Sequence, residues 1–495
     1  MKPRPSDPFA KKSIHVLLDE MKGGERLERA LGPVSLTALG VGATIGTGIY
    51  VLTGEVARNY AGPSLMLSFL LAAIGCGFAA LCYSELASMV PVAGSAYTYA
   101  YATLGEVFAW IIGWDLVLEY AISDAAVANG WSNYFVDLMQ NVFHWRIDPR
   151  LVAAPWDFEV ESGSFYWKTV TLASGASAQA WFNLPAMLVT AAITVVLVIG
   201  IKESARFNVG MVVLNIGIIL TIICVGSTHV DSSNWRPFLH EKKGWMGVAM
   251  GAAHIFFAYI GFDSISTHAE EAKNPQRDLT IGILGALTIC TVLYVGIAAV
   301  LTGMIPYKQI NVDAPLAAAF QSKGLASASA LITCGVLAGM TSTILVGNLS
   351  QARILLAMSR DGMLPHSFFG AIHERFKTPW KSTILVGVIV GLGGALAPLK
   401  FLADLVSVGT LFAFLIVCGA VLILRYTSPK IHRPFRVPAL PFVAAMGLLV
   451  NGGLLFWLGK DNWIRLFVWL AVGMLIYWRY SRYHTHLGKP APESP

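Results

Sequence analysis

GATIGTGIYV, residues 42–51, lies inside an apolar segment that is long enough to cross a membrane, yet it contains three glycines: Gly42, Gly46 and Gly48. Each glycine inside a helix destabilises that helix by about 1 kcal/mol relative to alanine. At membrane depth, an unpaired backbone group costs more still, because no water is available to bind it. We therefore predict that the helix is interrupted here and that a bound substrate pairs with the exposed backbone groups.

The composition of the whole chain favours an integral membrane protein. Of its 495 residues, 55% are hydrophobic and only 13% are charged, against about 25% charged residues in an average soluble protein. A membrane helix needs roughly 20 apolar residues. Twelve such stretches are present, at residues 34–59, 62–90, 104–125 with an extension to 138, 183–200, 203–226, 245–268, 280–304, 327–358, 382–399, 401–424, 439–459 and 463–480. We predict an all-α integral membrane protein with 12 transmembrane helices.

The polar segments predict the topology. Residues 1–32 are basic and lack the apolar core of a signal peptide, so we expect a cytosolic tail, with a second one at residues 481–495. In this orientation most lysines and arginines fall on cytosolic segments, as the positive-inside rule requires, and the charge of +6 calls for no nucleic-acid partner. Residues 140–181 are predicted to form an external loop with interfacial tryptophans. The expected location is the plasma membrane.

A second unusual stretch, FFAYIGFDS at residues 256–264, places a glycine and an acid in the middle of the sixth span. The interrupted spans are thus the first and the sixth, and each opens a group of five. This pattern is typical of a five-plus-five inverted repeat, which brings the two interruptions together at the membrane centre. We predict one transporter domain at residues 33–480, with repeats at 33–226 and 244–424 and two appended helices at 439–480.

The two interruptions together predict a site for a zwitterion. The free N–H groups of Thr47, Gly48 and Ile49 form the positive end of a half-helix and suit a carboxylate. Carbonyl groups of residues 41–44 and of the 257–260 turn suit an ammonium group. The alternative is that the glycines only permit close helix packing. The candidate substrate-binding residues are Gly42, Ala43, Thr44, Ile45, Gly46, Thr47, Gly48, Phe257, Ala258, Ile260, Met340 and Glu119.

Three ionisable residues in the spans are candidates for proton coupling: Lys202, Glu119 and Asp263. An ionisable group at membrane depth is a functional candidate by default, although Glu119 could instead be a neutral acid paired with a neighbouring helix. For Asp263, helix capping and a proton relay both stay open. Lys202 could exchange a proton, or it could only extend its ammonium group to the cytosolic interface.

The sequence contains no signature of an enzyme. The Gly46-x-Gly48 pair lacks the third glycine and the flanking strand of a dinucleotide loop, and no Walker lysine or catalytic triad is marked. All six cysteines fall inside apolar spans without metal-ligand spacing, so we expect no disulfide, no metal site and no cofactor.

Several stretches together resemble the amino acid, polyamine and organocation (APC) transporter superfamily, and within it the cationic amino acid transporter (CAT) family with its bacterial members. They are residues 42–51, ALCYSELA at 80–87, VPVAGSAYTY at 90–99, IGIKESARFN at 199–208, and residues 256–264 followed by EEAKNP at 270–275. The chain has Gly94-Ser95 where many members have two glycines.

This resemblance implies a leucine-transporter-like (LeuT-like) fold, alternating access, and an α-amino acid bound between the interruptions. It also implies that Thr44 to Gly48 hold the backbone of the substrate, that Phe257 acts as a gate, and that Lys202 matches the lysine of proton-coupled members.

The predicted function is proton-coupled symport of L-amino acids. Neutral, alanine-like substrates are favoured because Met340 and an otherwise apolar pocket limit the room for a side chain, although a methionine is more often core filler. The alternatives are a transporter or exchanger of arginine and lysine, with Glu119 as the acid, a sodium-coupled transporter, and a sensor that binds without translocating. The expected partners are an amino acid, protons and membrane lipids, with a monomer as the working assumption.

Overall fold

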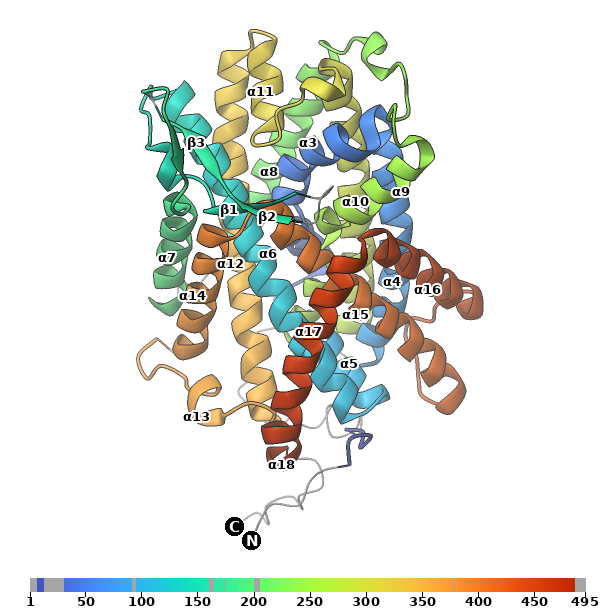
Figure 1. The fold of residues 1–495 in the computed structure, drawn as a ribbon. Helices are drawn as coiled ribbons and strands as arrows, with labels where there is room; N and C mark the ends of the chain where they lie inside the picture. Colours follow the sequence, from blue (N-terminus) through green and yellow to red (C-terminus); the bar gives the residue numbers. More distant parts are fainter. Residues whose placement is uncertain are drawn as a thin grey trace.

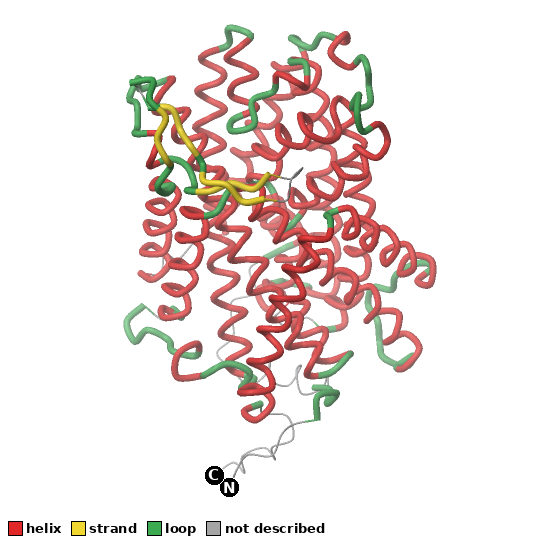
Figure 2. Tube along the Cα trace, in the orientation of Figure 1, coloured by secondary structure: helices red, strands yellow, loops and turns green. Residues whose placement is uncertain are grey.

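The computed structural model describes residues 7–12, 31–90, 95–159, 164–172, 174–199, 205–376 and 378–485. Most of these residues are helical, and the helices lie side by side in one bundle (Figure 1). The few strands, drawn yellow in Figure 2, run from the upper left of that view across the front of the helices.

A helix covers each of the predicted spans. The uninterrupted ones are α4 Leu65–Met89, α6 Glu106–Asn141, α7 Leu184–Ile199, α8 Ala205–Ser227, α10 Pro275–Met304, α12 Ala326–Arg360, α14 Trp380–Leu396, α15 Leu399–Thr427, α16 Leu440–Trp457 and α17 Lys460–Ile476. Shorter helices connect them: α5 Ser95–Thr103, α11 Pro315–Ser322, α13 His366–Phe369 and α18 Arg482–His484. The third span takes its long form, since α6 runs without a break past residue 138.

Seven stretches of the described chain are long and apolar enough to cross a membrane by length and composition alone. Three further apolar helices, Pro33–Thr44, Leu184–Ile199 and Trp380–Leu396, are shorter. The helix α6 is long, but Asp115, Glu119 and Asp124 lower its hydropathy. The chain is therefore a multi-pass membrane protein, and the count of twelve spans stays a prediction.

The helices pack in a definite pairwise order. The helix α4 lies along α10, α6 lies along α12, and α7 lies along α14. The helix α15 packs on both α4 and α6, and α16 covers α15 and α4 from outside (Figure 1). The centre of the bundle is therefore formed by helices from both halves of the chain.

The loop between α6 and α7 contains strands, so the all-α expectation is wrong for this segment. β1 Trp156–Glu159 pairs with β2 Ser164–Trp167, and β3 Thr169–Thr171 pairs with β4 Ser177–Gln179, both antiparallel. Aromatic and β-branched residues favour strands, and Gly175, at a φ of 81°, provides the turn of the second hairpin. The ring of Trp156 packs on Phe401 of α15 at 5.2 Å between centroids, so the first hairpin leans on the bundle.

Candidate functional site

The first predicted interruption is present. The helix α2 Pro33–Thr44 ends at Ile45, whose backbone is extended (φ −78°, ψ 95°), and helical structure resumes with the turn Gly48–Leu52, followed by α3 Thr53–Val56. Residues 45–52 are all buried. The interruption therefore lies inside the protein, as backbone outside a helix must at membrane depth.

The second interruption is present as well. The helix α9 Gly244–Ile255 tightens into the turn Phe256–Tyr259, the chain becomes extended at Ile260, and helical structure resumes at the turn Phe262–Glu271. Gly261 between them has a φ of 119°. Only glycine adopts this conformation without strain, which explains the glycine in the middle of the span.

The two interruptions touch each other. A Cβ atom on Gly48 would lie 2.7 Å from the Cβ of Ala258, and one on Gly261 would lie 2.6 Å from the carbonyl oxygen of Ala43. Side chains are excluded at both glycines, so the backbones of the two segments meet directly. This is the arrangement that the spacing of the interrupted spans predicted.

Hydroxyl groups from two other helices bind the carbonyl end of α2. The hydroxyl of Thr343 on α12 lies 3.1 Å from the carbonyl oxygen of Ile45 and 3.3 Å from that of Gly42. The hydroxyl of Tyr294 on α10 donates to the carbonyl oxygen of Thr44 at 3.0 Å. Neither hydroxyl was predicted from the sequence. The run of small polar residues after Met340 was the available signal for Thr343.

The N–H end of the interruption has fewer hydrogen bonds than its carbonyl end. The N–H groups of Gly46 and Thr47 have no hydrogen-bond acceptor within the described part of the chain. The hydroxyl of Thr47 lies 3.4 Å from the carbonyl oxygen of Val127 and 3.9 Å from the sulfur of Met340. Met340 is thus placed at the interruption, beside the hydroxyl of Thr47.

The other predicted site residues differ in their position relative to the first interruption. Phe257 is buried and its carbonyl oxygen accepts from the N–H of Ile260 at 3.2 Å. Glu119 lies two turns of α6 away from Val127, which is about 12 Å along the helix axis. It therefore lies away from the point where Val127 meets Thr47 of the first interruption. Lys202 falls outside the described residues.

Glu119, Asp115 and Asp263 form a buried group that we call the acid cluster. The carboxylate of Glu119 is close enough to the other two for electrostatic interaction, and the hydroxyl of Tyr120 donates to Asp263 at 3.4 Å. Both oxygens of Asp115 and one oxygen each of Glu119 and Asp263 have no hydrogen-bond partner among the described residues. Buried acids with unpaired oxygens are suited to binding a proton or water.

Asp124 is a further buried acid that the sequence analysis overlooked. It lies one turn before Val127 on α6 and faces Gly347 of α12, where a side chain would collide with its carboxylate. One of its oxygens, Oδ2, has no partner in the described part of the chain. Its position inside a span was a sufficient signal.

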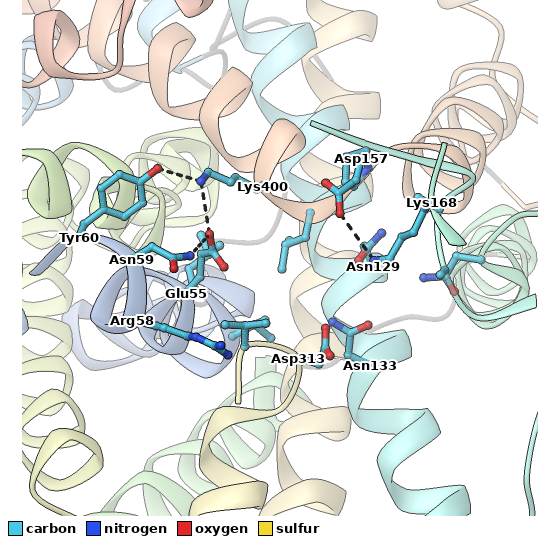
Figure 3. A pocket seen from close by; sticks show the side chains of 18 of the residues that line it. Glu55, Arg58, Asn59, Tyr60, Asn129, Asn133, Asp157, Lys168, Asp313 and Lys400 are labelled. Atoms are coloured by element: carbon cyan, nitrogen blue, oxygen red, sulfur yellow. Dashed lines mark hydrogen bonds and ion pairs between the residues drawn. The ribbon is translucent and has the colours of Figure 1, made fainter. Parts of the chain in front are cut away.

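A cavity of about 920 Å³ opens on the side of the β hairpins (Figure 3). It is lined by residues that follow the first interruption, by asparagines of α6 and by the first residues of α15, including Val51, Leu52, Asn129, Asn133, Asp157, Lys168 and Lys400. None of residues 42–48 lines it. The cavity therefore does not reach this part of the first interruption.

Polar contacts connect the helices around this cavity (Figure 3). The ammonium group of Lys400 at the start of α15 donates to the hydroxyl of Tyr60 at 2.8 Å and to Glu55 at 3.3 Å. One turn further along α15, Asp404 lies 2.6 Å from Nδ1 of His254 on α9. The helix α15 is thereby connected to the segments after the first and before the second interruption.

Comparison with known proteins agrees with this architecture. A family model described as "Amino acid permease" matches residues 31–477. The chain is 44% identical to the branched-chain amino acid permease BcaP of Bacillus subtilis, and 42% identical to the methylthioribose transporter of the same organism, over 97% of this chain and 99% of each relative. It is 41% identical to the vacuolar cationic amino acid transporter 2 of Arabidopsis thaliana, over 82% of this chain and 61% of the relative. The chain therefore belongs to the amino acid permease family of the APC superfamily.

Proposed function

We propose that this protein is a secondary transporter that carries L-amino acids across the plasma membrane together with protons, by alternating access. The contact of the two interruptions at Gly48 and Ala258 is the observation that carries the proposal. Two half-helices of opposite polarity meeting inside a bundle provide charged ends for both groups of an α-amino acid. Both termini are proposed to be cytoplasmic.

The pairwise packing of the helices supports a leucine-transporter-like inverted repeat of 12 spans. In a five-plus-five arrangement, α4 and α10 hold the second position of each half, α6 and α12 the third, and α7 and α14 the fourth. Each of these pairs is in contact. Pseudo-twofold symmetry brings equivalent helices together in this way.

The substrate carboxylate binds the N–H groups of Gly46 and Thr47, which have no other acceptor in the described part of the chain. The ammonium group binds the carbonyl groups of the second interruption and of Ala43. The carbonyl groups of Gly42, Thr44 and Ile45 contribute less, because Thr343 and Tyr294 already bind them. The side chain of the substrate then points towards Val127 and Met340.

This pocket favours small neutral side chains. Its wall is apolar at Cγ2 of Val127, which a Cβ atom on Gly46 would meet at 3.6 Å, and at Met340. Glu119 is about 12 Å from Val127 along α6, too far to pair with a short cationic group beside Val127. The alternative is a cationic substrate that reaches Glu119 with an extended side chain. One relative is named for branched-chain amino acids and another for methylthioribose, so these compounds belong in the test.

Proton coupling is assigned to the acid cluster and to Lys202. The unpaired oxygens of Glu119 and Asp263 can each take a proton, which removes the cost of burying a charge. A sodium-coupled transporter or an exchanger of the same fold is the alternative. If Lys202→Ala retains gradient-driven uptake with an unchanged pH dependence, Lys202 has no part in coupling.

A substrate panel in proteoliposomes tests the proposal. Labelled alanine is expected to be taken up under an inward proton gradient, and unlabelled alanine to compete better than leucine, arginine or methylthioribose. Uptake of arginine without uptake of alanine would overturn the neutral specificity. Saturable binding without accumulation of any compound would identify a sensor instead.

A further inference from the structure

The segment between α15 and α16 carries an unusual concentration of positive charge. Residues 425–437 read RYTSPKIHRPFRV and contain three arginines and a lysine but no acid. We call this segment the basic turn. It lies at the ends of two spans, so its side chains are placed at the boundary between membrane and water, on the cytosolic side in the topology proposed above.

A single buried carboxylate binds part of this charge. Glu85 on α4, whose side chain is 1% exposed, accepts from Nη2 of Arg425 at 2.5 Å and from Nε of Arg433 at 3.1 Å. It also accepts from the N–H of Val437 at 2.8 Å. Glu85 thereby fixes the shape of the basic turn. The three arginines carry three positive charges and Glu85 carries one negative charge, so two positive charges stay uncompensated. Lys430 adds one more.

The excess charge surrounds a cavity. An open cavity of about 440 Å³ is lined by Arg425 and Arg436, together with Tyr426, Pro438 and Leu440. Arg436 is exposed and has no carboxylate partner among the residues that the structure describes, and the buried Nε of Arg425 has no acceptor there either. The helix α16 begins at this cavity, and no side chain in the described part of the chain caps its first N–H groups. The positive end of the helix dipole therefore adds to the positive charge at the cavity. The cavity is thus suited to an anion.

The surroundings of the cavity are apolar and face outwards. The exposed fractions are 71% for Tyr426 and 62% for Phe442, and Ile423 is also exposed. The helix α16 lies at the edge of the bundle in Figure 1. In a membrane protein such side chains face acyl chains, and a tyrosine at a span end is typical of the interface.

We propose that this cavity binds the phosphate of an anionic phospholipid from the cytosolic leaflet, with Arg425 and Arg436 on the phosphate and the acyl chains along Ile423 and Phe442. A phosphate suits paired guanidinium groups because each can donate two parallel hydrogen bonds. Basic pockets beside transmembrane helices on this side of the membrane are known to select anionic headgroups. The lipid bridges α15 and α16, and this site is separate from the substrate site.

Native mass spectrometry of the delipidated, full-length protein tests the proposal without reading transport. Phosphatidylglycerol and phosphatidylcholine with identical acyl chains are added in separate samples. The wild-type protein is expected to retain phosphatidylglycerol preferentially. Because one arginine near the surface changes anionic lipid affinity about fivefold, Arg436→Gln should lower phosphatidylglycerol retention by that factor. Arg436→Lys keeps the charge but cannot donate two parallel hydrogen bonds, so it should restore retention only in part.

The matched control is Arg375→Gln, which removes an exposed arginine from another turn and should leave retention unchanged. The melting temperature of each variant without lipid establishes that it is folded. Equal retention of the two lipids, or unchanged retention in Arg436→Gln, would overturn the site. If millimolar inorganic phosphate raises the melting temperature as much as phosphatidylglycerol does, the cavity binds a free anion and the lipid assignment is wrong.

Discussion

Gly48 and Ala258 are in contact without any room for a side chain on Gly48, since a Cβ atom there would lie 2.7 Å from the Cβ of Ala258 and closer still to its Cα. The residues are more than 200 positions apart in the chain. Their contact brings together the two places where a membrane helix is interrupted, and the proposed binding of an amino acid depends on it.

The substitution Gly48→Ala should therefore separate the two interruptions. Overpacking of this kind costs about 1–3 kcal/mol. We expect uptake per folded molecule to fall at least tenfold, because about 1.4 kcal/mol, in the lower half of that range, already corresponds to a factor of ten. Gly77→Ala on α4 is the matched control, because a Cβ atom at that position meets nothing within 4 Å. Full uptake by Gly48→Ala at wild-type stability would show that the contact is not needed.

The hydroxyl of Thr343 is expected to hold the carbonyl end of the first interruption. Thr343→Val keeps the shape but leaves buried carbonyl groups of Gly42 and Ile45 with less hydrogen bonding, at a cost of about 1–3 kcal/mol. The melting temperature and the uptake should both fall, and Thr343→Ser should recover most of the loss. Thr221→Val, whose hydroxyl bonds only within α8, serves as the control. Equal behaviour of Thr343→Val and Thr221→Val would contradict the assignment.

The parts of the fold that could be predicted are those for which the sequence carries a local signal. The interruptions at residues 45–47 and 260–261 were predictable, because glycines in an apolar span weaken the helix that the membrane otherwise requires. The hairpins after Trp156 were not, since short strands outside the membrane carry little apolar periodicity. Boundaries shifted by a few residues, as for α10, which begins at Pro275 rather than at 280.

The site was predictable only in its backbone. Residues 42–48 and 257–260 were identified, but the partners that shape the site come from distant helices. Thr343, Tyr294 and Asp124 are placed by the packing of α12, α10 and α6, which no single stretch encodes. Glu119 was expected to contact the substrate, and this role stays a prediction; the structure places it two turns of α6 from Val127, beside Asp115 and Asp263.

Neutral substitutions in the acid cluster should uncouple transport from protons. Glu119→Gln and Asp263→Asn keep the side-chain size but remove the proton-binding group. We expect accumulation under a proton gradient to fall roughly tenfold or more, because the group that binds the proton is lost. Exchange of substrate across the liposome membrane at equal pH should continue. Asp137→Asn, nearer the outer end of α6, should change neither. Retained gradient-driven accumulation in both cluster variants would exclude the cluster from coupling.

We expect the contact between Lys400 and Glu55 to keep the cavity beside the β hairpins from reaching the candidate substrate site. Breaking it with Lys400→Met should increase the rate at which an aqueous thiol reagent modifies a cysteine introduced as Val51→Cys, which lines the cavity. In a double-mutant cycle with Glu55→Gln, the coupling should reach about 0.5 kcal/mol or more. Lys12→Met removes the pair with Asp361, neither residue of which lines this cavity, and should leave the rate unchanged. The same modification rate in Lys400→Met would contradict a gating role.

Uptake of labelled alanine into proteoliposomes, with proton and sodium gradients imposed one at a time, is the most direct test of proton-driven amino acid transport. We expect accumulation above equilibrium with the proton gradient alone and none with the sodium gradient alone. Accumulation driven only by sodium, or alanine that binds without accumulating under either gradient, would contradict proton coupling by this protein.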